Sequence, residues 1–318
     1  MVSSSVKKDL LIEALSYIKR FRDRIIVIKY GGAAMIEKNL KQSFAEDIVL
    51  LQSLGMKPVI VHGGGPEVSK AMEQLGQQVH FVEGLRVTSA ENLKVTEMVL
   101  SGTINKEIIA HLNTCGGKAV GLSGKDGHLI EASKKDGGEG VDLGYVGEID
   151  STNPELLRVL LKEGYIPVIS PIGLGKDGTS YNINADTAAS HIAVSLQAMK
   201  LIFMTDVEGI LENGKLCAEL KHDQALSMID SGVIEGGMKP KVQAALNAVT
   251  QGVESAQIIL GTDPHSVITE LFTDQGIGTK IVACKVVGKR VRNDSDPLHK
   301  VVIGSDQLTT SGSKIEST

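Results

Sequence analysis

Residues 24–32 read RIIVIKYGG, an apolar run that ends in a lysine, a tyrosine and two glycines. Consecutive apolar residues without polar alternation predict a strand that is covered on both faces, as in a parallel sheet. Similar runs follow at KPVIVHGG (57–64), YIPVIS (165–170), KLIFMTD (200–206) and AQIIL (256–260). Helical patterns separate them, so the sequence predicts an α/β protein with a mainly parallel central sheet sandwiched by helices.

Helix signals lie between the predicted strands. One segment that ends near Gly55 places apolar residues on a single helical face, at Leu40, Phe44, Ile48 and Leu51. Thr88 and Glu91 have the spacing of a capping box. Asn153 followed by Pro154 is typical of a helix start. These signals support the same fold class.

The patterning divides the chain into three parts. Residues 1–23 contain an amphipathic helix at 6–22, which is expected to pack on its own domain or on a neighbouring subunit. The main domain is expected to span residues 24–283. Its Gly- and Asp-rich stretch at 117–150 predicts hairpins over the sheet. Residues 284–318 form a polar tail without long apolar runs.

Composition argues against several classes of protein. Lys and Arg number 33 and Asp and Glu 38, so the net charge is -5, and Trp is absent. No nucleic-acid partner is expected, because such proteins usually have a basic face and aromatic platforms. No apolar run approaches the roughly 18 residues of a membrane span and no secretory signal is evident, so a cytoplasmic protein is expected. Reduced thiols and no metal site are predicted from three widely spaced cysteines, Cys115, Cys217 and Cys284.

Two glycine clusters follow the first two predicted strands. Lys29 stands just before Gly31 and Gly32, and the second strand runs into Gly63–Gly65, after which Pro66 opens a helix. Glycine-exposed amides and helix N-termini bind anions, and ligands of open α/β sheets lie at the carboxyl ends of strands. The clusters therefore predict a phosphate cradle, although each alone could be only a tight turn. Neither a P-loop nor a dinucleotide fingerprint is present, which disfavours P-loop ATPases and ordinary NAD enzymes.

Further polar residues stand beside other predicted strands. Arg86, in GLRVT, can clamp a carboxylate through two parallel N–H bonds, or can form an ordinary surface ion pair. Asn182, Asn184 and Asp186, in YNINADTAA, occupy alternate positions and would point to one side of an extended segment. Helix capping alone would also explain these three residues, with Asp186 starting the next helix.

Two later motifs add a loop and a pair of lysines. TDVEGIL (205–211) follows a buried strand and is typical of a loop that wraps a nucleotide. In GGMKPKVQAAL, Lys239 and Lys241 stand at the start of a predicted helix. Positive charge there is unfavourable by roughly 0.3–1 kcal/mol, so an anionic ligand explains a lysine better than stability does.

Taken in order, IKYGG, VHGGGP, GLRVT, NINADTAA, LIFMTDVEGIL and GGMKPKV resemble the motifs of the amino-acid-kinase family, over about residues 7–283. GLRVT with NINADTAA is similar to the branch that acts on N-acetyl-L-glutamate. The resemblance implies ATP-dependent phosphorylation of the side-chain carboxylate of that substrate, in arginine biosynthesis, with Mg²⁺ bound through the ATP phosphates. A carboxylate with an unperturbed pKa of about 4.3 is ionised near neutral pH, so the reaction needs no general base.

The resemblance also implies roles for individual residues. Lys29 and Lys241 match lysines that neutralise the transferring phosphoryl group, and Asp186 matches the aspartate that orients both. Gly31 and Gly32 match phosphate-binding positions. The acceptor is implied to contact Gly64, Gly65, Arg86, Asn182 and Asn184. The nucleotide is implied to lie along Thr205, Asp206 and Gly209. An acceptor lobe is expected up to about residue 180, and an ATP lobe from about 181.

Regulation is implied by the first helix. ALSYIKRF (14–21) is similar to the extra N-terminal helix of arginine-inhibited members of the family. This implies inhibition by arginine and a homo-hexamer built from interlaced dimers, and a PII-type regulator is a further candidate partner. Residues implied to lie near the inhibitor are Tyr17, Glu270 and Gly276. Gln257 departs from the histidine usual in that group.

Two other functions remain open. A kinase for glutamate or aspartate would share most of these motifs, and activity that disappears when the N-acetyl group is removed would distinguish the two substrates. A non-catalytic arginine or nucleotide sensor is less favoured, because a sensor need not keep Lys29, Lys241 and Asp186 together.

Overall fold

The structure is a computed structural model that describes residues 4–283 except 83, 139 and 274–275. The predicted tail at 284–318 lies outside the described residues. The strands of the central sheet are β1 (Ile25–Tyr30), β2 (Lys57–His62), β5 (Ala119–Ser123), β8 (Ile166–Ser170), β11 (Lys200–Thr205), β14 (Glu219–Lys221), β15 (Ser255–Leu260) and β16 (Thr279–Val282).

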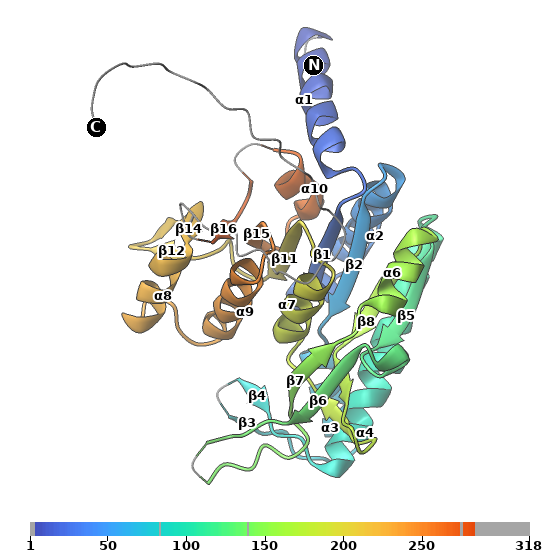
Figure 1. Cartoon of the computed structure of the whole chain (residues 1–318), viewed down its shortest axis with the longest axis vertical. Coiled ribbons are helices and arrows are strands. Elements are labelled where there is room, and N and C mark those ends of the chain that lie inside the picture. The colour runs from blue at the N-terminus through green and yellow to red at the C-terminus, as the bar shows by residue number, and fades with distance from the viewer. Residues whose placement is uncertain (1–3, 83, 139, 274–275, 284–318) are drawn as a thin grey trace, which may run out of the picture. The chain divides into compact units, whose positions relative to one another are not determined.

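These eight strands of the described chain lie in the order β14-β16-β15-β11-β1-β2-β8-β5 (Figure 1). All neighbours are parallel except β15 and β16. The five predicted strands are confirmed as β1, β2, β8, β11 and β15. The mainly parallel central sheet is therefore confirmed. β2 ends at His62, two residues earlier than predicted, because Gly63 and Gly64 already belong to the following loop.

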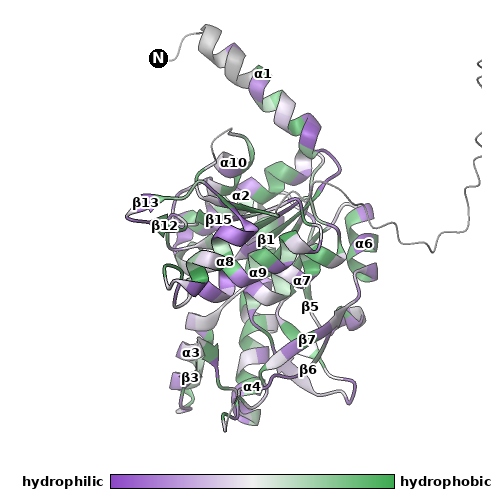
Figure 2. Ribbon diagram, turned by 60° about the vertical axis from the view of Figure 1, so that its left-hand side comes forward, coloured by the Kyte–Doolittle hydropathy of each residue, from purple (hydrophilic) through white to green (hydrophobic). Residues whose placement is uncertain are grey.

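Most of the longer helices cover the two faces of this sheet, whereas the first of them extends away from it (Figure 1). They are α1 (Ser4–Phe21), α2 (Lys38–Ser53), α3 (Gly65–Gln74), α4 (Ala90–Glu97), the π-helix η2 (Met98–Ile104), α5 (Asn105–Thr114), α6 (Glu155–Lys162), α7 (Ala185–Ser195), α8 (His222–Asp230), α9 (Met238–Thr250) and α10 (Ser266–Leu271). The amphipathic helix predicted at the N-terminus is confirmed by α1. In Figure 2 the helices carry both polar and apolar residues, as expected for helices with one buried face.

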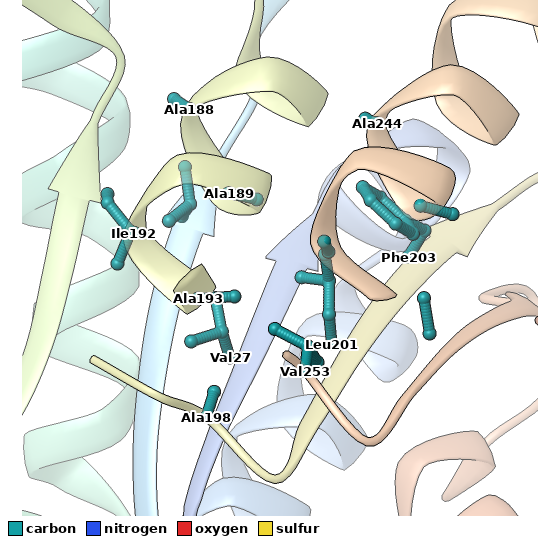
Figure 3. Close-up of a cluster of buried hydrophobic side chains, with 14 of the residues drawn as sticks. Val27, Ala188, Ala189, Ile192, Ala193, Ala198, Leu201, Phe203, Ala244 and Val253 are labelled. Atoms are coloured by element: carbon teal, nitrogen blue, oxygen red, sulfur yellow. The ribbon is translucent and has the colours of Figure 1, made fainter. Parts of the chain in front are cut away.

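Strand β1 shows how the two faces are filled. Val27 belongs to a hydrophobic core formed with α6, α7, α8 and α9. Its neighbours Ile26 and Ile28 belong to a second core, formed with α2, α5 and α10. Figure 3 shows part of the first core, in which Ala193 of α7 and Leu201 of β11 lie near Val27. Side chains alternate across a strand, so an unbroken apolar run supplies both cores at once.

A second sheet has the order β10-β9-β6-β7, from β6 (Ile130–Lys134), β7 (Gly147–Thr152), β9 (Ile172–Leu174) and β10 (Ser180–Asn182). β6 and β7 form an antiparallel pair, which confirms a hairpin within 117–150. The prediction was wrong for residues 119–123, since β5 is the edge strand of the central sheet. The shorter elements are η1 (Gly32–Met35), η3 (Asp126–His128), β3 (Phe81–Val82), β4 (Leu85–Arg86), β12 (Leu211–Glu212) and β13 (Lys215–Leu216).

Helix boundaries agree with the sequence signals to within a residue or two. α2 ends just before Gly55, whose φ of +86° suits a glycine. The Thr88 capping box was wrong: the cap of α4 is Ser89, whose Oγ accepts from the N–H of Asn92. The hydroxyl of Thr88 instead donates to the carbonyl of Arg86. The competing serine is one residue away and has the same chemistry, which is why spacing alone chose the wrong one.

Candidate active site

Three charged side chains from three separate elements meet at the centre of the molecule. Lys29 Nζ, from β1, lies 3.2 Å from Asp186 Oδ1, and Lys241 Nζ, from α9, lies 2.9 Å from Asp186 Oδ2. Asp186, on α7, is 7% exposed and Lys241 is 6% exposed. The structure thus brings together all three predicted catalytic residues. Lys239, by contrast, is exposed.

The charges of this triad do not cancel. Burial alone would raise the pKa of Asp186, but the two neighbouring ammonium groups hold that pKa below its ordinary value. Burial lowers the pKa of Lys241, and the Asp186 carboxylate opposes that shift. Two ammonium groups sharing one carboxylate leave a net positive charge in a buried position, which favours binding of an anion.

The first glycine loop lies against Lys29. A Cβ on Gly31 would stand 2.6 Å from Lys29 Nζ, so a larger residue there would displace this ammonium group from its present position. Gly32 has a φ of +71°, and a Cβ would collide with the carboxylate of Asp206. Asp206 Oδ1 accepts a 2.6 Å hydrogen bond from the N–H of Ala33. Asp206, which was predicted to contact the nucleotide, thus binds the loop that was predicted to bind phosphate.

The second glycine loop opens α3. Gly64 precedes the helix with a φ of +150°, and a Cβ there would collide with Ile104 and lie 2.8 Å from Leu100. Gly65 is the first helical residue, where backbone N–H groups have no partner within the helix. Such a helix start, together with the positive end of its dipole, is suited to a negatively charged group.

Beside this loop lies a cavity of about 190 Å³. Its lining includes Gly63 and all five predicted acceptor residues, which are Gly64, Gly65, Arg86, Asn182 and Asn184. Arg86 is 8% exposed, and its Nη2 donates to the carbonyl of Gly65 and to Ser69 Oγ, both at 2.7 Å. Its guanidinium stands 4.7 Å from the ring centre of Phe81. Within the described part of the chain Arg86 has no carboxylate partner, so the surface ion pair considered above is wrong.

Asn182 and Asn184 both line this cavity, but their side-chain amides have different hydrogen-bond partners. Asn182 Nδ2 donates to Thr88 Oγ1 at 3.2 Å. Asn184 is the cap of α7: its Oδ1 accepts from the N–H groups of Asp186 and Thr187. The helix therefore starts at Ala185, one residue before the predicted start, and Asn184 fixes the backbone that carries Asp186.

The remaining predicted nucleotide residues lie after β11. Thr205 ends that strand, and its carbonyl accepts from the N–H of Gly261. Gly209 has a φ of +149°, and a Cβ there would stand 2.6 Å from Thr279 Oγ1. Because β11 neighbours β1 in the sheet, this loop and the first glycine loop leave the same edge.

The residues predicted to lie near an inhibitor gather around α1 and α10. The ring of Tyr17 packs edge-on against that of Phe272, at 6.3 Å between centres. Glu270 accepts from the N–H of Ile277 at 3.0 Å, and a Cβ on Gly276 would stand 2.6 Å from its carboxylate. Burial raises the pKa of Glu270. Glu270 is therefore a buried acidic side chain near the C-terminal end of α10.

The sequence analysis did not single out Lys200, which lies between Glu270 and Gln257. Its Nζ is 4.0 Å from Glu270 Oε1 and 5.6 Å from the ring centre of Phe21. The Gln257 carboxamide is satisfied when its oxygen accepts from Lys200 Nζ at 3.0 Å. A lysine at the start of an otherwise apolar strand was the signal that could have identified it.

No helix of the described chain is long and apolar enough to cross a membrane. Among the same residues there is no group of three or more His, Cys, Asp or Glu side chains placed to hold a metal ion.

Two glycine loops, a buried excess of positive charge and a cavity lined by Arg86 are suited to phosphate and carboxylate groups, as in α/β proteins that transfer phosphoryl groups. The model of the amino acid kinase family matches residues 24–260, and the chain belongs to that family. The chain is a kinase. An acetylglutamate kinase of Desulforamulus reducens is 50% identical over 287 residues, covering 89% of this chain and 100% of that protein.

Two solved structures of a different enzyme are also similar to this chain. N-acetylglutamate synthase from Neisseria gonorrhoeae, complexed with coenzyme A and N-acetyl-glutamate, aligns with a TM-score of 0.79 at 29% identity. The alignment covers 88% of this chain and 64% of the synthase. The same synthase complexed with coenzyme A and L-arginine aligns with a TM-score of 0.75 at 27% identity, covering 88% of this chain and 66% of that one.

Proposed function

We propose that this kinase transfers the γ-phosphoryl group of ATP to the side-chain carboxylate of N-acetyl-L-glutamate, giving N-acetyl-L-glutamyl 5-phosphate for arginine biosynthesis. The observation that carries the proposal is the Lys29–Asp186–Lys241 triad beside a cavity lined by a buried Arg86, which has no carboxylate partner among the described residues. The identity with acetylglutamate kinases supports the choice of acceptor.

The chemistry asks mainly for positioning and charge neutralisation. The acceptor carboxylate is ionised at neutral pH, so it attacks the phosphoryl group without losing a proton. Lys29 and Lys241 would neutralise charge on the transferring oxygens, and Asp186 would keep the two ammonium groups in place. The amides at Gly31, Gly32 and Gly64 would bind the same oxygens.

The two substrates occupy the two sides of the triad in this proposal. Arg86 would bind the α-carboxylate of the acceptor, and Asn182 its acetamido group, within the part of the domain that extends to about residue 180. The nucleotide would lie along Thr205, Asp206 and Gly209, in the part that begins near residue 181. An arginine binds a carboxylate through two parallel N–H bonds, which fixes orientation as well as charge.

Mg²⁺ would be bound through the ATP phosphates and would supply further neutralisation of their charge. Both oxygens of Asp186 face lysines, at 3.2 and 2.9 Å, so this carboxylate is unsuited to hold a metal ion directly. The described residues are therefore consistent with a cation that reaches the protein together with the nucleotide.

The decisive experiment measures ADP release with ATP and Mg²⁺, comparing N-acetyl-L-glutamate, L-glutamate, L-aspartate and no acceptor. Hydroxylamine traps the acyl phosphate. We expect a signal only with N-acetyl-L-glutamate. Arg86→Lys should raise KM for this acceptor by about tenfold or more with little change in KM for ATP, because a lysine cannot form the two parallel bonds. Equal activity with glutamate or aspartate would overturn the choice of substrate.

A regulatory function is favoured by the cluster of Glu270, Lys200 and Gln257 beneath α1. We infer that arginine binds here, with its cationic groups facing the buried Glu270 carboxylate, and inhibits the enzyme in a hexamer linked by α1. The arginine complex of the related synthase supports this inference. Arginine at millimolar levels should lower activity in the wild type and have no effect in Glu270→Gln. An unchanged rate and an unchanged Tm in the wild type would exclude the inhibition.

A further inference from the structure

His62, at the end of β2, is fully buried next to the second glycine loop. Its Nδ1 lies 2.8 Å from the carbonyl oxygen of Gly63, and its Nε2 lies 3.2 Å from Nδ2 of Asn105. A carbonyl oxygen can only accept a hydrogen bond and an amide nitrogen can only donate one. The proton is therefore on Nδ1, Nε2 is unprotonated, and the imidazole is neutral.

The orientation of Asn105 is fixed by other groups. Its Nδ2 also donates to the carbonyl of Val168 on β8, at 2.9 Å, and its Oδ1 accepts from Lys106 Nζ at 3.1 Å. A Cβ on Gly121, inside β5, would collide with Asn105 Oδ1 and with Ile109. Gly121 thus leaves space for Asn105, which contacts three neighbouring strands, β2, β5 and β8.

Asn105 follows directly on the π-helix η2. Wide helical turns of this kind are rare and occur frequently at functional sites. Here the π-helix brings Leu100 and Ile104 against Gly64, where a Cβ would collide with Ile104 unless these side chains moved. The segment formed by η2 and Asn105 therefore supports the loop in two ways. Its apolar side chains pack on Gly64, and Asn105 donates to His62, which in turn donates to Gly63.

We propose that His62 and Asn105 are positioning residues that hold Gly63–Gly65 in the conformation that receives the acceptor and the transferring phosphoryl group. The N–H of Gly63 donates to the carbonyl of Tyr30 at 2.8 Å, so with His62 both polar groups of this residue are fixed. A neutral imidazole makes this bond without adding charge beside Lys29 and Lys241. The proposal rests on the proposed function for the identity of the acceptor.

Two conservative variants separate the two ring nitrogens. His62→Asn places an amide N–H near the position of Nδ1, and so can still donate to Gly63. His62→Gln places its amide near the position of Nε2, and so can still meet Asn105 but not Gly63. Leu157→Ala, in the core under α6, is the control for a loss of stability that does not touch the loop.

The readout is KM for each substrate, kcat and Tm. We expect His62→Gln to raise KM for N-acetyl-L-glutamate by about tenfold, the size of one lost hydrogen bond, with a much smaller change for ATP. His62→Asn should stay close to the wild type, and Leu157→Ala should lower Tm without changing either KM. The proposal is overturned if both His62 variants shift KM equally, or if they change only Tm.

The tautomer can be tested without any activity. A ¹⁵N imidazole spectrum should show, for the signal lost in His62→Asn, a protonated Nδ1 and an unprotonated Nε2 between about pH 6 and pH 8. The opposite tautomer would overturn the proposal. If the wild type prefers another acceptor, the substrate named above is wrong, and the same comparison of variants with that acceptor still decides the role of His62.

Discussion

At the scale of single residues, the carboxylate of Asp186 is the counter-ion that the described part of the chain offers to both the buried Lys241 and the largely covered Lys29. Asp186→Asn should lower the free energy of unfolding by about 3–5 kcal/mol and abolish turnover, because both lysines lose their counter-ion. Inorganic phosphate should then raise Tm more in this variant than in the wild type, since an anion replaces the missing charge. Thermal unfolding with and without phosphate measures this difference.

A double variant provides the control. Asp186→Asn combined with Lys241→Met removes one positive charge together with the negative one, so the extra effect of phosphate should shrink. If phosphate raises Tm equally in the wild type, the single variant and the double variant, the triad is not the anion site.

His62 gives a second prediction at this scale, in the pH dependence of stability. Burial lowers its pKa from 6.5 to about 4. Between these values the unfolded chain binds a proton that the folded chain does not, so stability falls as pH falls, by about 3 kcal/mol in all. Urea unfolding of wild type and His62→Asn from pH 7 to pH 4 isolates this contribution, because all other groups are shared. Parallel curves for the two proteins would contradict it.

At the scale of elements, η2 packs closely against the second glycine loop, because its Leu100 and Ile104 meet Gly64. Gly64→Ala should lower the free energy of unfolding by about 2–4 kcal/mol and raise KM for the acceptor, because the new methyl group meets Leu100 and Ile104 at a strained φ. Denaturant unfolding and steady-state kinetics measure the two effects.

Gly76→Ala is the matched control for this contact. Gly76 follows α3 with a φ of +70°, but no atom lies within 4 Å of a Cβ placed there. This variant should lose about 1–2 kcal/mol of stability from backbone strain alone and keep its KM values. A similar rise in KM for both variants would show that the packing under Gly64 has no special role.

The sequence predicted the central strands that are buried on both faces and the hairpin of β6 and β7, and it missed β5. β1, β2, β8, β11 and β15 are unbroken apolar runs, so their own residues determine their state. β5 has a glycine at its centre, which is explained by Asn105 and Ile109 of the neighbouring helix α5. Because the glycine is required by a neighbouring helix, the residues of β5 themselves give no sign that a strand tolerates it.

The same distinction applies to the candidate site. The roles of Lys29, Asp186 and Lys241 were implied by the resemblance to a kinase family, and each residue stands near the end or the start of a recognisable element. Asn105 could not be predicted, because its partners come from other strands. Lys200 was missed, although a lysine in an otherwise apolar strand is a signal in the local pattern. Asn184 was expected to face the acceptor or to cap a helix, and the structure shows that it caps α7.

At the scale of the whole molecule, α1 presents apolar side chains to solvent. Ile12 and Leu15 are 57% and 53% exposed. Exposed apolar residues on one helix favour contact with another subunit. Removing residues 1–13 should therefore lower the mass measured by sedimentation without lowering kcat, since no residue of the triad or of the glycine loops lies on α1. Ile12→Ser with Leu15→Ser should have the same effect in the full chain, and an unchanged mass would contradict the contact.

The position of β1 in the sheet has a consequence for how the protein is made. β1 is the first strand to be synthesised, yet its neighbours are β2 and β11, and β11 begins at Lys200. Pairings over such long separations in sequence form slowly. β1 can pair with β2 early in synthesis, but its other edge stays open, and available for aggregation or for a chaperone, until β11 has been made. The triad cannot form before Lys241 in α9 has been added, so every nascent chain that ends before this residue lacks a lysine of the candidate site.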